Sequence, residues 1–331
     1  MKNLLTDVAG LRVGHAQDEK LASGVTVVLF DEPAVAAIDV RGGGPGTRET
    51  ALLEPALTVP GVDAIVLSGG SAFGLDAASG VQAWLAEQGR GFRVGDALVP
   101  IVPGAILFDL LNGGDKAWGR YPPYRELAYA ATASASRDNA ALGNVGAGFG
   151  ATTVNIKGGL GTASAITPEG HTVSALAAVN ACGSATIGDG PWFWAAPLEQ
   201  DGEFGGRGMP APMPPDAHIP KLKGDAGQNT TLVIIATDAV LTKAQASRLA
   251  VMAQSGMARA LYPVHTPLDG DVVFAAATGR KPLSDPLYGL AQLGAMAGKV
   301  VARAVARGVY EATALPFPGA LRDWRTKFGR R

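Results

Sequence analysis

A threonine hydroxyl stands at a sharp boundary in this chain. Residues 223–228 form a short polar stretch, and the run Asn-Thr-Thr-Leu-Val-Ile-Ile-Ala that begins at Asn229 is typical of a buried strand. Attack of the Thr230 hydroxyl on the carbonyl carbon of Asn229 would give an ester by an N-to-O acyl shift, and water would then release a chain beginning with Thr230. The junction therefore predicts self-cleavage between Asn229 and Thr230.

The released threonine would have a base of its own. A free α-amine has a pKa of about 7.7–8.0, so near neutral pH it can accept the proton of the adjacent hydroxyl. Pairs of a threonine hydroxyl and an N-terminal amine are a known means of activating this weak nucleophile. A threonine at the start of a strand is more often only a β-former, so the assignment of Thr230 depends on the residues around it.

Two further side chains have groups suited to this chemistry. Asn180 ends an apolar run, where its amide can stabilise a tetrahedral oxyanion or simply form a turn. Lys157 follows an apolar residue and precedes two glycines. Close to Thr230, its cation would keep the new amine neutral, lower the pKa of the hydroxyl or hold a carboxylate. The alternative is an ordinary lysine that faces solvent at a strand end.

Asp269 and Asp271 lie two residues apart, so on an extended backbone they face the same side. We expect them to orient the α-ammonium and Lys157, or to share a proton; Asp-Gly is also a hairpin signal. His265 suggests a triad, but a self-cleaved threonine has its own base, and we interpret His265 as a loop residue. The sequence predicts neither a metal nor a cofactor. The remaining histidines and the single cysteine show no ligand spacing, and the Gly-Ala-Gly string at 146–148 lacks the rest of a dinucleotide loop.

Composition narrows the class of protein. The 331 residues are 47% hydrophobic and 17% charged with a net charge of −1, which argues against a nucleic-acid partner. The 45 dispersed glycines indicate tightly packed layers and many sharp turns. The one cysteine cannot form an intrachain disulfide, and no apolar run is long enough to cross a membrane. We therefore expect a soluble, cytoplasmic protein that does not bind membranes.

Strand and helix patterns alternate along the chain. We predict strands at 24–30, 36–40, 63–67, 231–237 and 272–277, and a strand-like region over 144–179 with a hairpin turn at 168–170. Predicted helices begin at Asp76 as N-cap, at 125, at the Thr242 capping box and at 284. Residues 188–228 lack periodicity and predict a long surface connection that leaves the cleavage point accessible. This order predicts an α/β or α+β protein with sheets stacked between helices.

Seven strings of the chain together resemble one family, the DmpA-like self-processing aminopeptidases and amidases, over nearly the whole length. This family includes β-peptidyl aminopeptidases and the aminohexanoate-oligomer (nylon oligomer) endo-hydrolases. The strings occur in family order: Gly42-Gly-Gly-Pro-Gly-Thr-Arg-Glu-Thr50, Ser68-Gly-Gly-Ser-Ala-Phe-Gly-Leu-Asp76, Gly143-Asn-Val-Gly-Ala-Gly148, Lys157-Gly-Gly-Leu-Gly-Thr-Ala-Ser164, Val179-Asn-Ala-Cys-Gly183, Asn229-Thr-Thr-Leu232 and His265-Thr-Pro-Leu-Asp-Gly-Asp271.

The resemblance implies a four-layer αββα sandwich, cut into a large part (1–229) and a small part (230–331) that together form one domain and assemble into homo-oligomers. It implies a nucleophilic Thr230, an oxyanion-binding Asn180, and Lys157, Asp269 and Asp271 as further catalytic residues. Two positions depart from some family members: Phe108 stands in the place of a tyrosine, and Ile106 in the place of a glutamate that holds the substrate amine. We expect these two residues, with Ser71 and Phe73, to contact the substrate.

These features favour an amide hydrolase of the endo type, acting on oligoamides such as aminohexanoate oligomers. An aminopeptidase of the β-peptidyl or D-/L-type is the first alternative. An acyltransferase is the second, because ornithine acetyltransferases have a similar self-cleaving Ala-Thr-Met-Leu strand. The third is an uncleaved binding protein that has kept the fold.

Overall fold

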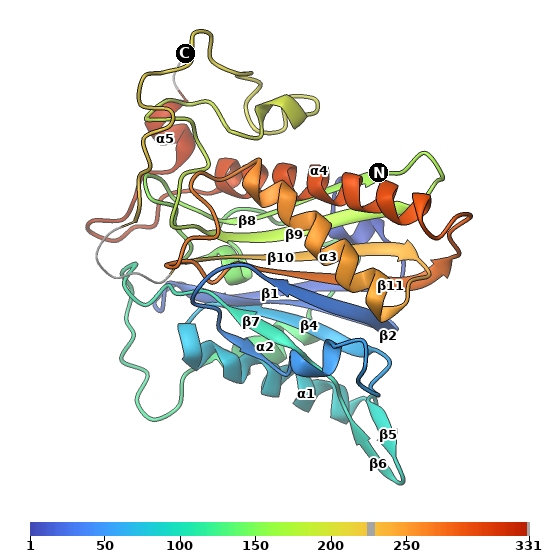
Figure 1. Ribbon diagram of the computed structural model, residues 1–331. Coiled ribbons are helices and arrows are strands. Elements are labelled where there is room, and N and C mark those ends of the chain that lie inside the picture. Colours follow the sequence, from blue (N-terminus) through green and yellow to red (C-terminus); the bar gives the residue numbers. More distant parts are fainter. Residues whose placement is uncertain (224–228, 330–331) are drawn as a thin grey trace.

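Residues 1–223 and 229–329, the part described by a computed structural model, fold into four layers (Figure 1). Helices α1 (Ala77–Glu87) and α2 (Tyr124–Ala133) cover one outer face, and α3 (Lys243–Ala258) and α4 (Tyr288–Glu311) cover the other. Two layers of strands lie between the helix pairs, and the short helix α5 (Trp324–Phe328) follows α4. The predicted αββα sandwich is confirmed.

One long strand joins the two strand layers. Residues 25–29 of β2 (Ser23–Val40) pair with β4, while residues 35–40 pair with β11. The sequence predicted two separate strands here; they are two halves of one 18-residue strand, with an irregular register between Leu29 and Ala34. The paired order is β3 (Thr47–Arg48), β7 (Gly104–Ile106), β4 (Val62–Ser68), β2, β11 (Val272–Lys281), β10 (Thr230–Ala239), β9 (Thr172–Asn180) and β8 (Leu160–Ile166).

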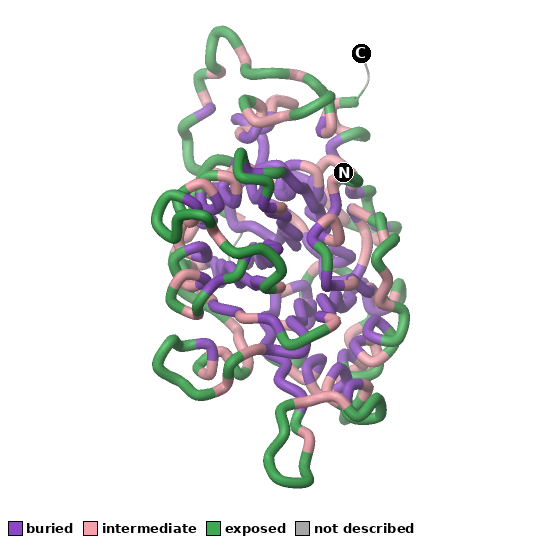
Figure 2. The backbone as a smooth tube through the Cα atoms, turned by 90° about the vertical axis from the view of Figure 1, so that its right-hand side faces the viewer, coloured by how far each residue is buried: buried purple, intermediate pink, exposed green. Residues whose placement is uncertain are grey.

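Two smaller pieces of sheet complete the strands. β1 (Leu11–Asp18) pairs antiparallel with the first half of β2 and was not predicted. β5 (Phe92–Val94) and β6 (Ala97–Val99) form a hairpin that projects from the body near α1 (Figure 1). This hairpin is largely exposed, whereas the strands of the main layers are mostly buried (Figure 2).

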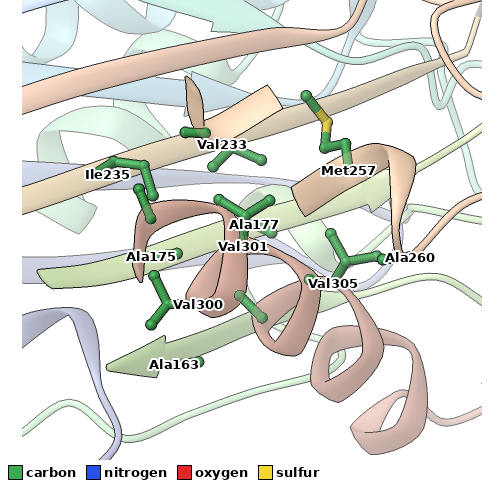
Figure 3. Close-up of a cluster of buried hydrophobic side chains, with 14 of the residues drawn as sticks. Ala163, Ala175, Ala177, Val233, Ile235, Met257, Ala260, Val300, Val301 and Val305 are labelled. Carbon is green, nitrogen blue, oxygen red and sulfur yellow. The ribbon is translucent and has the colours of Figure 1, made fainter. Parts of the chain in front are cut away.

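Strand β10 is buried on both faces, because its residues alternate between two cores. Leu232 and Ile234 pack between the two strand layers. Val233 and Ile235 face the opposite way, against α3 and α4, where Figure 3 shows Val233 and Ile235 beside Val301. A strand covered on both sides needs a continuous apolar run rather than a polar–apolar alternation. This explains why the sequence after Thr231 reads as an uninterrupted hydrophobic segment.

Local signals predicted some element ends and missed others. The capping box of α3 is confirmed: the Gln245 amide donates to Thr242 Oγ1 at 3.2 Å, and the Thr242 amide donates to Gln245 Oε1 at 2.9 Å. The hairpin turn between β8 and β9 is also confirmed. Asp76 stands at the N-cap position of α1 as predicted, but its side chain makes no capping hydrogen bond, because its carboxylate accepts from Arg125. Residues 144–159 are not a strand and contain only a 3-10 turn at Gly146–Gly148.

The connection before β10 runs along the outside of α4. Residues 188–223 contain no regular element beyond the short 3-10 helix Ala196–Leu198. The connection is anchored to α4 by the buried Arg303, whose Nε donates to Glu203 Oε1 at 2.5 Å. The same guanidinium also holds the N-terminal segment, because its Nη2 donates to Asn3 Oδ1 at 3.0 Å. Within the described ranges, no helix is long and apolar enough to cross a membrane.

We predict that Gly256→Ala destabilises the packing of α3 on α4. A Cβ at Gly256 would lie 2.3 Å from the carbonyl oxygen of Gly298 and 2.6 Å from Val301 Cβ, neither of which can move aside without shifting α4. The overpacking cost of about 1–3 kcal/mol should exceed the gain of about 1 kcal/mol in helix propensity. Thermal unfolding should show a lower midpoint, whereas the exposed neighbour Ser255→Ala should not lower it. An unchanged or raised midpoint for Gly256→Ala would contradict this packing.

Candidate active site

Strands β9 and β10 place Asn180 directly opposite Thr230 in their antiparallel register. Both side chains are buried, with Asn180 1% and Thr230 3% exposed. The Thr230 hydroxyl donates to the carbonyl oxygen of Asn229 at 2.6 Å. The structure thus brings together the hydroxyl, the peptide bond that precedes it and the amide side chain that the sequence predicted to act with them.

The carbonyl of Asn229 also receives a backbone donor. The Gly270 amide donates to the Asn229 oxygen at 2.6 Å, so two donors converge on one peptide carbonyl. A Cβ at Gly270 would lie 2.7 Å from Thr230 Oγ1 and 2.7 Å from the Gly44 oxygen. Only glycine therefore lets the 269–271 turn approach the hydroxyl this closely. The arrangement polarises the carbonyl and concentrates partial positive charge where an oxyanion would form.

The two aspartates fix different parts of the site. Asp271 accepts from the Thr231 amide at 2.7 Å, and its other oxygen accepts from the His265 amide at 3.1 Å and contacts His265 Nδ1 at 2.9 Å. His265 lies in a loop, as predicted, but its contact with Asp271 was missed. Asp271 thereby ties the start of β10 to the 265–271 loop.

Asp269 links the same loop to the end of β9. It accepts from the Cys182 amide at 3.0 Å through one oxygen and from the Thr266 amide and hydroxyl through the other. Burial raises the pKa of Asp269, and the nearby charge of Asp271 raises it further. The two carboxylates therefore interact electrostatically. Together they hold the end of β9 and the start of β10 against the 265–271 loop.

Lys157 has a different environment from the one expected. Its Nζ donates to three backbone carbonyls, those of Gly148, Ala151 and Gly158, at 3.2, 2.7 and 2.6 Å. An ammonium has three donors, so these carbonyls occupy all of them, and the expectation that Asp269 and Asp271 orient Lys157 is not met. Burial lowers the pKa of Lys157 to about 7.

The amide of Asn180 is held from three sides. Its Oδ1 accepts from the Thr152 amide at 3.0 Å and from Lys223 Nζ at 3.1 Å, and its Nδ2 donates to the Phe108 carbonyl at 2.9 Å. A side-chain amide has two N–H donors, so one donor remains for an oxyanion beside Thr230. Thr152 and Lys223 were not predicted, because both lie in irregular segments without a sequence signal.

The predicted substrate contacts divide into two groups. Phe108 reaches the site through its carbonyl, and the Ser71 amide donates to the carbonyl of the preceding residue, Leu107, at 2.9 Å. Ile106 is buried, Arg48 is the single charged residue among those packed around it, and the space between them is too small for a water molecule. Phe73 is 52% exposed and packs edge-to-face on Trp118, so it lies at the surface.

Asp109 was not predicted as part of the site. It is buried, accepts from the Ser23 hydroxyl at 2.6 Å and from the Gly70 amide at 2.8 Å, and burial raises its pKa. Gly70 adopts a φ of 84°, and a Cβ there would collide with the Tyr124 ring. The turn at 69–70 therefore requires its two glycines. Asp109 holds this turn next to the Phe108 carbonyl.

The sequence and the fold correspond to known proteins. Residues 3–320 match the model of peptidase family S58. A Mycobacterium tuberculosis protein named an uncharacterized aminopeptidase is 45% identical, over 96% of this chain and 99% of its own. A 6-aminohexanoate-oligomer endohydrolase from a Kocuria strain is 28% identical, over 84% of this chain and 75% of its own.

Solved structures agree on the fold. A Burkholderia β-aminopeptidase matches with a TM-score of 0.72 at 23% identity, covering 100% of this chain and 95% of that one. The L-aminopeptidase D-Ala-esterase/amidase of Ochrobactrum anthropi, described as a variant of the Ntn hydrolase fold, matches with a TM-score of 0.71 at 20% identity, covering 99% and 95%. The chain belongs to peptidase family S58, and it is a hydrolase that acts on amide bonds.

We predict that Asn180→Ala leaves a folded protein with greatly reduced turnover. Loss of one oxyanion donor typically lowers kcat by about 10²–10³-fold, because the donor is felt mainly in the transition state. Steady-state kinetics should show this loss with little change in KM. An unaltered kcat combined with a lower unfolding midpoint would instead make Asn180 a structural residue of the β9 end.

Proposed function

We propose that the chain cleaves itself between Asn229 and Thr230, and that Thr230 then serves as the nucleophile of the amide hydrolase. The observation that supports this most directly is the position of Thr230 Oγ1, 2.6 Å from the carbonyl oxygen of Asn229, which the Gly270 amide also contacts. The products would be a large chain of residues 1–229 and a small chain of residues 230–331.

Self-cleavage would proceed in two steps, an N-to-O acyl shift and the hydrolysis of the resulting ester. Thr230 Oγ1 adds to the Asn229 carbonyl carbon while Gly270 N–H stabilises the oxyanion, and the C–N bond then breaks. The nitrogen leaves as an amine with the proton that the hydroxyl lost, and an ester joins the two parts. Water hydrolyses this ester, which frees the Asn229 carboxylate and restores the hydroxyl. The junction is buried rather than accessible as the sequence predicted, which suits an attack that uses the chain's own hydroxyl.

Turnover repeats the same chemistry on a substrate. The freed α-amine takes the Thr230 proton, and the oxygen attacks the substrate carbonyl, whose oxyanion receives the second N–H of Asn180. The substrate C–N bond breaks as the α-ammonium returns the proton to the leaving amine. Water then hydrolyses the acyl-threonine. An acyltransferase would differ only in this last step, and product analysis with an added amine acceptor separates the two.

We predict that the smaller band of the purified protein begins Thr-Thr-Leu-Val on Edman sequencing. Thr230→Ala should remain at full length and inactive, because no hydroxyl is present. Thr230→Ser should process partly, because the methyl group takes no part in the chemistry. Intact mass measures all three proteins. Cleavage that persists in the alanine variant would assign it to a host protease, and a fully active wild type of uncut mass would contradict the proposal.

For the substrate, we propose oligoamides cleaved at internal bonds, as the name of the Kocuria relative states for that protein. The surroundings of Ile106 support this, because the described residues packed around it include no carboxylate that could hold a terminal ammonium, and an unpaired buried charge is costly. The aminopeptidase alternative is favoured by the name of the more similar Mycobacterium relative. Assembly into homo-oligomers and a cytoplasmic location are part of the proposal and are inferred from the sequence.

We predict that linear aminohexanoate oligomers are cleaved both with a free amine and after N-acetylation, the acetylated form at internal bonds. Mass spectrometry of early products distinguishes internal fragments from single residues. If acetylation abolishes hydrolysis and only N-terminal residues are released, the aminopeptidase alternative is correct.

A further inference from the structure

The connection that leads to the scissile bond also contacts the proposed oxyanion donor. The Lys223 backbone amide donates to the Cys182 carbonyl at 3.1 Å, which attaches the connection beside the end of β9. The Lys223 Nζ donates to Asn180 Oδ1 and to the Thr152 carbonyl, each at 3.1 Å. One residue, seven positions before Thr230 in the sequence, therefore fixes both its own segment and the side chain opposite the hydroxyl.

These contacts determine which way the Asn180 amide faces. In the observed orientation two donors, the Thr152 amide and Lys223 Nζ, meet Oδ1, and the Phe108 carbonyl meets Nδ2. A flipped amide would set N–H groups against two donors and oxygen against oxygen, so every one of these hydrogen bonds would be lost. Without Lys223, one neutral donor alone would oppose the flip at Oδ1. A lysine at position 223 therefore supplies a charged donor to Oδ1 that a small polar side chain would not supply.

The charge of Lys223 has a second effect on the amide. A cation that donates to Oδ1 withdraws electron density from the amide, and chains of hydrogen bonds polarise one another. The N–H groups of Nδ2 then become stronger donors toward an oxyanion. Burial lowers the pKa of Lys223 to about 8, while the nearby Cys182, Asp109 and Asp269 favour its ammonium form.

We propose that Lys223 is a positioning residue, which locks and polarises the amide of Asn180 for turnover. This inference depends on the proposed role of Asn180 as the oxyanion donor. Within the described residues, the Lys223 Nζ donates to Asn180 Oδ1 and the Thr152 carbonyl and not to Thr230 or the Asn229 carbonyl, so we expect it to act through Asn180.

The test compares Lys223→Met, Lys223→Arg and Asn180→Ala with the Asn180→Ala/Lys223→Met double variant. Lys223→Met keeps the unbranched, flexible side chain except for its terminal atom and removes its donors. This variant should lower kcat by roughly ten- to hundredfold and change KM less than about threefold. A loss of this size is typical when a residue that orients a metal ligand is removed, and we expect the same here for a residue that orients an oxyanion donor. Lys223→Arg should recover much of kcat, because it restores a cationic donor.

The double variant separates positioning from an independent role. If Lys223 acts through Asn180, Lys223→Met should cause no further loss of kcat in the Asn180→Ala background. Multiplicative losses, or a Lys223→Met effect on KM alone, would overturn the proposal. A normal kcat in Asn180→Ala would instead refute the role of Asn180 itself, so the two failures are distinguishable.

Lys221→Met is the matched control. Lys221 lies two residues earlier on the same connection and pairs with Asp189 at 2.9 Å and Asp216 at 3.1 Å. Its loss should leave kcat and self-cleavage unchanged. Equal losses in the Lys221 and Lys223 variants would show that both only hold the connection in place, which would overturn the specific role of Lys223. Unfolding midpoints of both variants identify any loss that comes from misfolding.

Discussion

The pairing of β9 with β10 is the constraint on which the site depends. A two-residue side-chain period means that a slip of one position would turn Asn180 away from Thr230 and would also reverse every core contact of β10. The register is fixed because β10 is buried on both faces, with Leu232 and Val233 packed in opposite cores. The burial of apolar side chains that stabilises the sandwich therefore also keeps Asn180 opposite Thr230.

Glycine supplies the second constraint. Groups of the 269–271 turn can reach Thr230 only because Gly270 has no side chain, and the Gly42–Gly44 segment packs against the same turn. The Gly44 amide donates to the Asp269 carbonyl at 2.8 Å. Three of the glycines, Gly42, Gly43 and Gly270, are thus explained by the close approach of two backbone segments beside Thr230.

Sequence reasoning was most successful where local chemistry determines structure. The Thr242 capping box, the β8–β9 turn and the buried run after Thr230 are each specified by neighbouring residues, and the layered fold followed from their order. Contacts made between distant irregular segments were missed. Lys223, Thr152 and Asp109 meet the site through turns whose course depends on the whole sandwich, and Lys157 is held by carbonyls that no residue type can signal. The continuous β2 was missed because its bend interrupts the apolar pattern.

The strand order has a consequence for the life of the molecule after it is cut. β10 and β11 belong to the segment that follows Asn229, and they lie between β9 and β2, which precede it. A cut at Asn229 would leave the second segment hydrogen-bonded to the first along both edges of the β10–β11 pair, with α4 of the second segment packed on β8 and β9 of the first. Separation would require the central sheet to open on two sides at once, so the pair should persist for as long as the fold does. Once unfolded, however, the two pieces would have to find each other in dilute solution, and reassembly would become a second-order process. The stability of the cut molecule would therefore be kinetic: it would depend on a slow rate of unfolding, because refolding would be slower than for a continuous chain.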